Sequence, residues 1–83
     1  MVKLHGIGNI AFRVCGNDHR PAHFHVVAPD FKAMVEIETM TLIRGILPAR
    51  DRHAVMAWAT EHQAEIAAAW NLLDPDLAIR ESP

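Results

Sequence analysis

The hydrophobic period of this chain changes once, near Pro48, and that change restricts the folds that the chain can adopt. Before Pro48, apolar residues tend to alternate with polar ones, which is the period of two expected of half-buried strands. From Pro48 to about Leu73, apolar residues recur at helical spacing, and proline suits a first helical turn because its missing N–H has no partner there. We therefore predict an α+β fold, in which a three- to four-stranded antiparallel sheet is packed on one face by a single long C-terminal helix.

The chain length indicates one domain over residues 1–83. We place the sheet at about 7–47, the helix at about 48–73 and a short polar tail at 74–83. A domain of this size buries only roughly 60% of its unfolded surface. A protein partner, or self-association into a homo-oligomer, would therefore add stability.

Charge and hydropathy restrict the partners of the chain. The net charge of −2 gives no broad electrostatic reason to hold nucleic acid, which is kept only as a weakly supported partner. No apolar run approaches the roughly 20 residues that cross a bilayer, and the first residues lack the pattern of a secretory signal. Cys15 is the single cysteine and cannot form an internal disulfide. We expect a cytoplasmic protein that does not associate with membranes.

The alternating half of the chain divides into four predicted strands. Phe12 lies on the apolar side of the first strand and is a core residue. The turn-forming residues of "CGNDHRPA" make a loop before the second strand, and the four residues "PDFK" connect the second and third strands in a hairpin. The predicted strands are Ile7–Val14, His23–Ala28, Ala33–Glu38 and Thr41–Leu47.

One face of the predicted helix is apolar and should pack against the sheet. Because His62 lies in this face, we expect it to be mostly buried and hydrogen-bonded toward the sheet or the "NDHRP" loop. Truncation of Trp58 or Trp70 to alanine should then cost about 3–5 kcal/mol. The residues of this face are Val55, Trp58, Ala59, His62, Ile66, Ala69, Trp70 and Leu73.

The predicted hairpin has an apolar and a polar side. Its apolar side should face the helix, so His23 and His25 point away from the helix. If the two residues that flank the four-residue connection pair with each other, His25 lies opposite Glu36 and His23 lies opposite Glu38. The uncovered side of the sheet would thus carry a square of two imidazoles and two carboxylates.

Three interpretations of this His–Glu square stay open. His23 and His25, with His19 from the adjoining loop and the two carboxylates, have the ligand types of a divalent transition-metal site. The same histidines could instead act in acid–base hydrolysis, with Arg20 holding a phosphate group. Alternatively, the cross-strand His–Glu pairs only stabilise the hairpin, by a few tenths of a kcal/mol each.

A small positive patch is a second candidate feature. Arg44, Arg50 and Arg52 lie close together in the sequence. With Lys32 or Arg20 they would present a cationic surface. A solvated helix start is the simpler interpretation of these arginines.

Five segments occur here in a distinctive order, namely "NDHRPAHFH", "KAMVEIET", "GILPAR", "AWATEHQAEI" and "AAAWN". Together they resemble a bacterial family called domain of unknown function 4160, over about residues 7–71. The chain departs from the family pattern at Ala22, where a second proline is usual, and in its tail. The residues that match the family signature are Asp18, His19, Pro21, His23, His25, Glu38, Gly45, Pro48, Trp58, His62 and Trp70.

The resemblance implies a fold but no established reaction. Genes of this family often lie beside another small gene, in an arrangement that resembles toxin–antitoxin modules. We therefore favour a small protein-interaction module that binds the cognate protein encoded by the adjacent gene, through the open sheet face with Val27 and Met34 exposed, or through an edge strand. The alternative is a His-based or metal-dependent, ribonuclease-like hydrolase that uses His19, His23 and His25.

Overall fold

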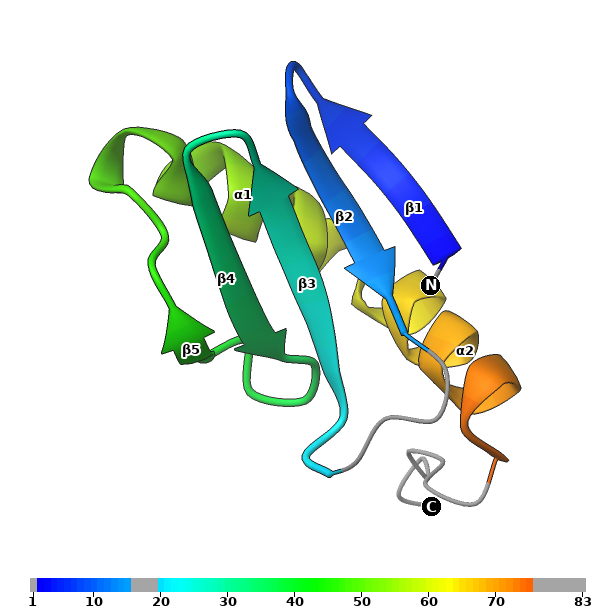
Figure 1. The fold of residues 1–83 in the computed structure, drawn as a ribbon. Coiled ribbons are helices and arrows are strands. Elements are labelled where there is room, and N and C mark those ends of the chain that lie inside the picture. The colour runs from blue at the N-terminus through cyan, green and yellow to red at the C-terminus, as the bar shows by residue number, and fades with distance from the viewer. Residues whose placement is uncertain (1, 16–19, 76–83) are drawn as a thin grey trace.

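The computed structural model describes residues 2–15 and 20–75, which form an antiparallel sheet covered on one face by two helices (Figure 1). The predicted α+β class is confirmed, but the described residues form five strands and two helices instead of three to four strands and one helix. The five strands lie side by side in chain order. They are β1 (Val2–Ile7), β2 (Ile10–Val14), β3 (His23–Ala28), β4 (Phe31–Glu36) and β5 (Leu42–Gly45), followed by α1 (Ala49–Glu61) and α2 (Gln63–Leu73).

The additional strand is β1, which pairs with β2 in a hairpin. Ile7 lies opposite Ile10, so the turn has only two residues, Gly8 and Asn9. Gly8 has a φ of 57°, which glycine adopts without the steric penalty of a side chain. Glycine followed by asparagine is a typical two-residue hairpin turn, and it ends one strand and begins the next.

The hairpin of β3 and β4 has a tighter turn than the sequence predicts. Ala28 lies opposite Phe31, so only Pro29 and Asp30 connect the strands. Phe31 begins β4 because its side chain is buried on the same side of the sheet as Ala33. The predicted register is therefore wrong by two residues. Because side chains alternate with a period of two, the faces of both strands are nevertheless as predicted, except at His23, whose ring packs against Trp70 of α2 instead of pointing away from the helices.

The fourth predicted strand is present as β5, at one edge of the sheet. Gly45 lies opposite Ala33 and has a φ of 85°. A Cβ atom at this position would lie 2.2 Å from the carbonyl oxygen of Lys32. Only glycine therefore allows β5 to approach β4 this closely.

The helical segment is divided at His62, so the prediction of a single long helix is wrong. The φ of −113° and ψ of 21° at His62 depart from helical values and separate α1 from α2. Directly after the break, Gln63 donates its side-chain amide to the carbonyl oxygens of Ile37 and Glu38, at 2.7 and 3.2 Å. These two bonds hold the start of α2 against the turn that follows β4.

His62 is half-buried, whereas the sequence predicts it mostly buried. Its described hydrogen bond is also not directed toward the sheet, as predicted, but stays within the helical segment. Its Nδ1 lies 2.8 Å from the carbonyl oxygen of Trp58, within the same helical segment. The contact with the sheet is aromatic instead, since His62 and His5 of β1 both stack on the Trp58 indole.

The hydrophobic core fills the space between the sheet and the helices. The apolar helix face packs against the sheet as predicted, with Trp70 fully buried and Trp58 half-buried. Phe12 is also fully buried, as predicted. The buried apolar residues are Ile10, Phe12, Val14, Ala22, Phe24, Val26, Ala28, Phe31, Ala33, Val35, Ile37, Leu47, Val55, Ala59, Ile66 and Trp70.

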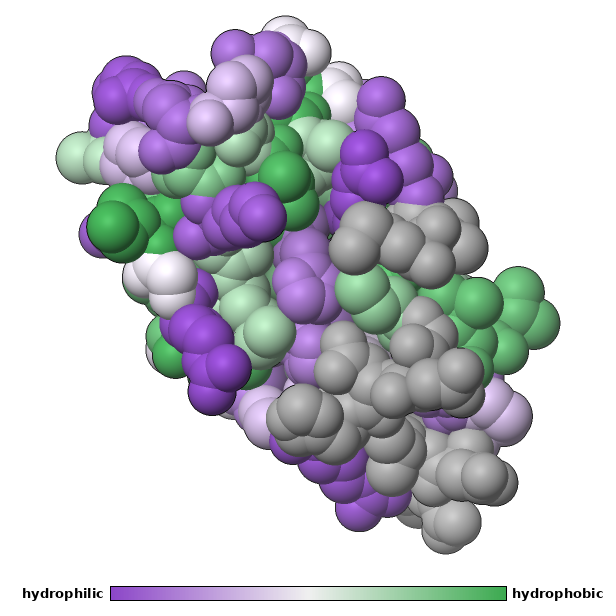
Figure 2. Space-filling model, viewed as in Figure 1, coloured by the Kyte–Doolittle hydropathy of each residue, from purple (hydrophilic) through white to green (hydrophobic). Residues whose placement is uncertain are grey.

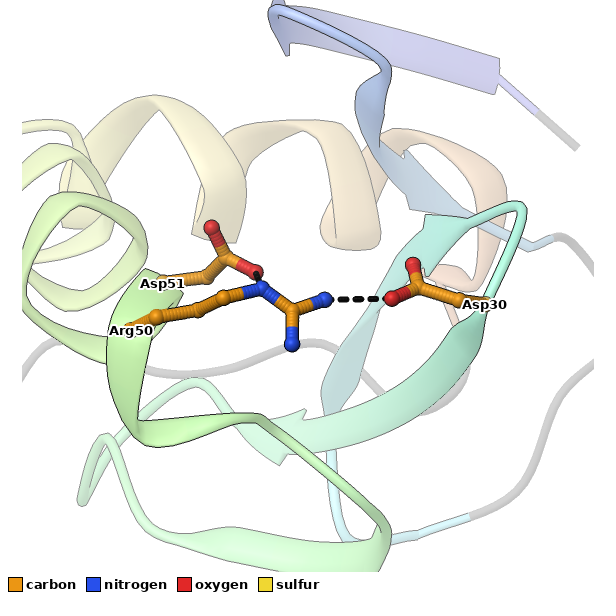
Figure 3. Close-up of polar contacts among 3 residues, drawn as sticks. All are labelled: Asp30, Arg50 and Asp51. Carbon is orange, nitrogen blue, oxygen red and sulfur yellow. Dashed lines mark hydrogen bonds and ion pairs between the residues drawn. The ribbon is translucent and has the colours of Figure 1, made fainter.

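An ion-pair cluster joins the β3–β4 turn to the first turn of α1 (Figure 3). Arg50 donates to the carboxylate of Asp30, and its Nε lies 3.3 Å from the carboxylate of Asp51. The Arg50 and Asp30 side chains are 64% and 58% exposed, so solvent screens the pair and it contributes about 1 kcal/mol or less. Neither helix, nor any other helix among residues 2–15 and 20–75, is long and apolar enough to span a membrane.

Candidate functional site

Both helices cover the same face of the sheet, and the opposite face has no helix over it among the described elements (Figure 1). We call this opposite face the open face. Figure 2 views the molecule from this side, where purple hydrophilic side chains alternate with pale and green hydrophobic ones over the strands. By strand alternation and cross-strand pairing, the open face carries Lys3, Arg13, His25, Val27, Lys32, Met34, Glu36 and Arg44.

The predicted square of histidines and carboxylates does not form on the open face. His25 lies opposite Met34 instead of Glu36, and His23 lies opposite Glu36 instead of Glu38. Glu38 follows the end of β4 and is exposed. The shorter β3–β4 turn causes this change, because it moves every cross-strand partner by two residues. Glu36 accepts a hydrogen bond from the hydroxyl group of Thr39.

His23 is buried, although the sequence predicts it on an exposed surface. Its side chain is only 2% exposed, and its ring centroid lies 5.3 Å from that of Trp70 and 5.1 Å from that of His25. Its Nδ1 lies 2.7 Å from the carbonyl oxygen of Pro21, which can only accept a hydrogen bond. The β2–β3 ladder ends at the pair of Arg13 and His25, so His23 lies past it, where its ring meets α2.

The remaining predicted site residues do not complete a metal or catalytic cluster within the described structure. His19 lies outside the described residues, and Arg20 is exposed before the start of β3. Over residues 2–15 and 20–75, no group of three histidine, cysteine, aspartate or glutamate side chains could hold a metal ion. The metal and acid–base interpretations therefore stay predictions that depend on His19.

A row of side chains that includes the three cations Lys3, Arg13 and Arg44 crosses the open face. Cross-strand pairs join Lys3 to Arg13, Arg13 to His25, His25 to Met34, and Met34 to Arg44. Neighbouring strands are about 4.8 Å apart, so the row spans roughly 19 Å. Lys3 and Arg44, at its two ends, are exposed.

A shallow depression lies beside the row, over β3, β4 and β5. Its volume is about 120 Å³. Lys32 and Arg44 are exposed at its border, and His25 and Met34 are half-buried. Gly45 contributes backbone but no side chain, which leaves the space above the close β4–β5 contact open. The lining residues are His25, Lys32, Ala33, Met34, Arg44 and Gly45.

The positive patch expected around "RGILPARDR" is therefore divided between two places. Arg44 and Lys32 lie together on the open face. Arg50 is paired with Asp30 and Asp51, and Arg52 donates to the carbonyl oxygen of Leu47 at 3.2 Å. Only the first pair is available to an external anion at this surface.

The sequence interpretation missed Lys3 and Arg13 as members of the site. Arg13 alternates with the buried Phe12, so its orientation could have been predicted from the strand pattern. Lys3 could be placed only after β1 was known, and the two-residue turn of Gly8 and Asn9 is the signal for that strand.

A comparison with protein-family models matches residues 9–71 to the family described as Domain of unknown function (DUF4160). The matched segment runs from the β1–β2 turn to α2 and contains most of the open face. The comparisons with curated proteins and with solved structures gave no match.

Proposed function

Since this chain belongs to the DUF4160 family, whose description states no activity, we propose that it is a protein-interaction module that binds a small cognate protein in a toxin–antitoxin-like pair. The binding surface is the open face. The observation that carries the proposal is the two-layer architecture, in which both helices pack on one side of a five-stranded sheet. A sheet of this kind has a second face that water or a partner must cover.

The composition of the open face supports protein binding. Val27 and Met34 are half-buried near its centre, and the charged side chains of Lys3, Lys32 and Arg44 are exposed around them. An apolar centre with a polar rim is the usual anatomy of a protein interface. Methionine and arginine are also enriched at such surfaces.

The alternative hydrolase receives less support from the described residues. A general acid or base must come within hydrogen-bonding reach of its substrate. His23 is 2% exposed, and its Nδ1 is engaged with Pro21. We therefore favour protein binding as the function of this chain, and we keep catalysis by His19, His23 and His25 as the competing hypothesis.

Co-expression with the adjacent gene product tests the proposal. The tagged chain is purified with the untagged neighbour, and growth is scored for each gene alone and for both together. We expect the neighbour to co-elute, and one gene to relieve a growth defect that the other causes. The variant Met34→Glu places a charge at the centre of the open face and should abolish co-elution, because a carboxylate would be buried in the interface.

The matched control is Ala68→Glu, which adds the same charge to an exposed position of α2 and should bind normally. Val27→Glu provides a second test of the open face, and the melting temperature of each variant establishes that it folds. If the neighbour does not co-elute, or if Met34→Glu and Val27→Glu bind as well as Ala68→Glu, the proposed function is wrong.

A further inference from the structure

The charge of the open face indicates the chemistry of its partner. Four of the seven lysines and arginines among residues 2–15 and 20–75 lie on this face, namely Lys3, Arg13, Lys32 and Arg44. Glu36 is the one carboxylate that the described strands place there, and it is hydrogen-bonded to Thr39. The acidic residues Asp51, Glu61 and Glu65 lie on the helices instead. The helices also carry Arg50 and Arg52, so their net charge is −1, whereas the open face of the described strands has a net charge of +3.

The exposed cations of this face have no counter-ion within the described structure. Lys3, Lys32 and Arg44 make no ion pair with any residue among 2–15 and 20–75. Lys3 also lies directly opposite Arg13, which adds a second basic residue to the same part of the open face.

The depression provides a place for one anionic group. Lys32 and Arg44 border it, and the Arg44 guanidinium can bind a carboxylate through two parallel hydrogen bonds. Met34 supplies an apolar side chain to the lining, which suits the methylene groups of a glutamate side chain. We infer that the partner of the open face is an acidic protein surface that places a carboxylate between Lys32 and Arg44. This inference rests on the proposed function, because it names the partner chemistry at the same surface.

Nucleic acid, the other common anionic partner, fits this face less well. Proteins that hold single strands on a sheet stack the bases on exposed aromatic rings. The chain has no tyrosine, and Phe12, Phe24, Phe31 and Trp70 are buried, while Trp58 of α1 packs against His5 of β1 on the helix-covered side. The open face of the described strands therefore has no phenylalanine, tyrosine or tryptophan ring on which a base could stack.

Titration of the isotope-labelled full chain with defined probes tests the inference. The first probe is a short synthetic peptide of alternating glutamate and valine, the second is the same peptide with glutamine in place of glutamate, and the third is a short oligouridine RNA. We expect the acidic peptide to shift the amide signals of Lys32, Met34 and Arg44 at low salt, and to bind more weakly at roughly 300 mM NaCl because the charges are then screened. The glutamine peptide and the RNA should bind more weakly than the acidic peptide.

Charge-removing variants locate the contact. Arg44→Gln and Lys32→Gln should each weaken binding of the acidic peptide by about two- to fivefold, the usual effect of one exposed ion pair. Arg50→Gln removes the same charge on the other side of the molecule and should leave binding unchanged. The melting temperatures of all three variants establish that they are folded. Equal binding by Arg44→Gln, Lys32→Gln and Arg50→Gln, or tighter binding of the RNA at the same residues, would overturn the inference.

Failure of this inference is distinguishable from failure of the proposed function. If the adjacent gene product does not co-elute but the acidic peptide binds the open face, the proposed pairing is wrong and the acidic preference stands. If the neighbour binds Arg44→Gln and Lys32→Gln as tightly as it binds the unaltered chain, the pairing stands and the acidic preference is wrong.

Discussion

The imidazole of His62 stacks on the indole of Trp58, with ring centroids 4.4 Å apart and planes inclined by 13°. His5 of β1 stacks on the same indole, at 4.6 Å and 4°. The three rings connect an edge strand of the sheet to the break between α1 and α2. Such ring contacts contribute about 0.5–1.5 kcal/mol beyond the area that they bury.

We therefore expect His62→Ala to lower the free energy of unfolding by about 1–2 kcal/mol, since it removes the ring contact and the hydrogen bond to the Trp58 carbonyl oxygen. Urea denaturation at constant pH measures this change. His53→Ala is the control, because His53 is an exposed residue of α1. A His62→Ala variant as stable as His53→Ala would show that the stack contributes nothing.

The two glycines with positive φ should respond differently to alanine. At Gly8, with a φ of 57°, a Cβ would have no atom within 4 Å, so Gly8→Ala should cost only about 1–2 kcal/mol of backbone strain. At Gly45, a Cβ would lie 2.2 Å from the Lys32 carbonyl oxygen, and either β5 or β4 must move. We expect Gly45→Ala to cost at least about 1 kcal/mol more than Gly8→Ala in urea denaturation. Equal costs would contradict the close β4–β5 approach.

The faces of the strands could be predicted from the sequence, whereas their register could not. The alternation that places Val26 inward and His25 outward holds under any shift of two residues. The register depended on the length of one turn, and the pattern does not show whether Phe31 belongs to the turn or to the strand. Phe31 belongs to β4 because its side chain is buried in the core. This burial exists only in the folded chain, so the sequence pattern does not show it.

The site residues that the sequence misplaced depend on contacts between distant segments. His23 is buried because Trp70, from the other end of the chain, packs against it. The helix breaks at His62, and Gln63, the first residue of α2, is bonded to the carbonyls of Ile37 and Glu38. Neither contact has a local sequence signal. The β1 strand did have one, the Gly8–Asn9 turn, and with it Lys3 could have been placed beside Arg13.

The two tryptophans should differ in their contribution to stability, although the sequence places both on the apolar helix face. Trp70 is fully buried, and Trp58 is half-buried. Trp70→Ala should cost about 3–5 kcal/mol, a large part of the stability of so small a domain. Trp58→Ala should cost less, because less of its surface leaves water on folding. Thermal or urea denaturation of both variants checks this order, and the reverse order would mean that α1, not α2, provides the main contact with the sheet.

The neighbouring histidines of β3 should also differ, and this difference separates a buried structural residue from a surface one. His23 is 2% exposed, donates from Nδ1 to the Pro21 carbonyl oxygen and packs against Trp70, whereas His25 is half-buried. We expect His23→Ala to cost about 2–3 kcal/mol, since it leaves the Pro21 carbonyl without this donor and opens space beside Trp70. His25→Ala should cost less.

The variant His23→Asn tests the cause of that loss. An asparagine amide nitrogen can take the place of Nδ1 and donate to Pro21, but it does not replace the rest of the ring. We therefore expect His23→Asn to recover about 1 kcal/mol relative to His23→Ala in urea denaturation, the usual value of one hydrogen bond. If His23→Ala proves no more destabilising than His25→Ala, the His23 ring is not a structural element. Such a result would favour the hypothesis that the His23 ring binds a substrate or a metal ion over the hypothesis that it stabilises the fold.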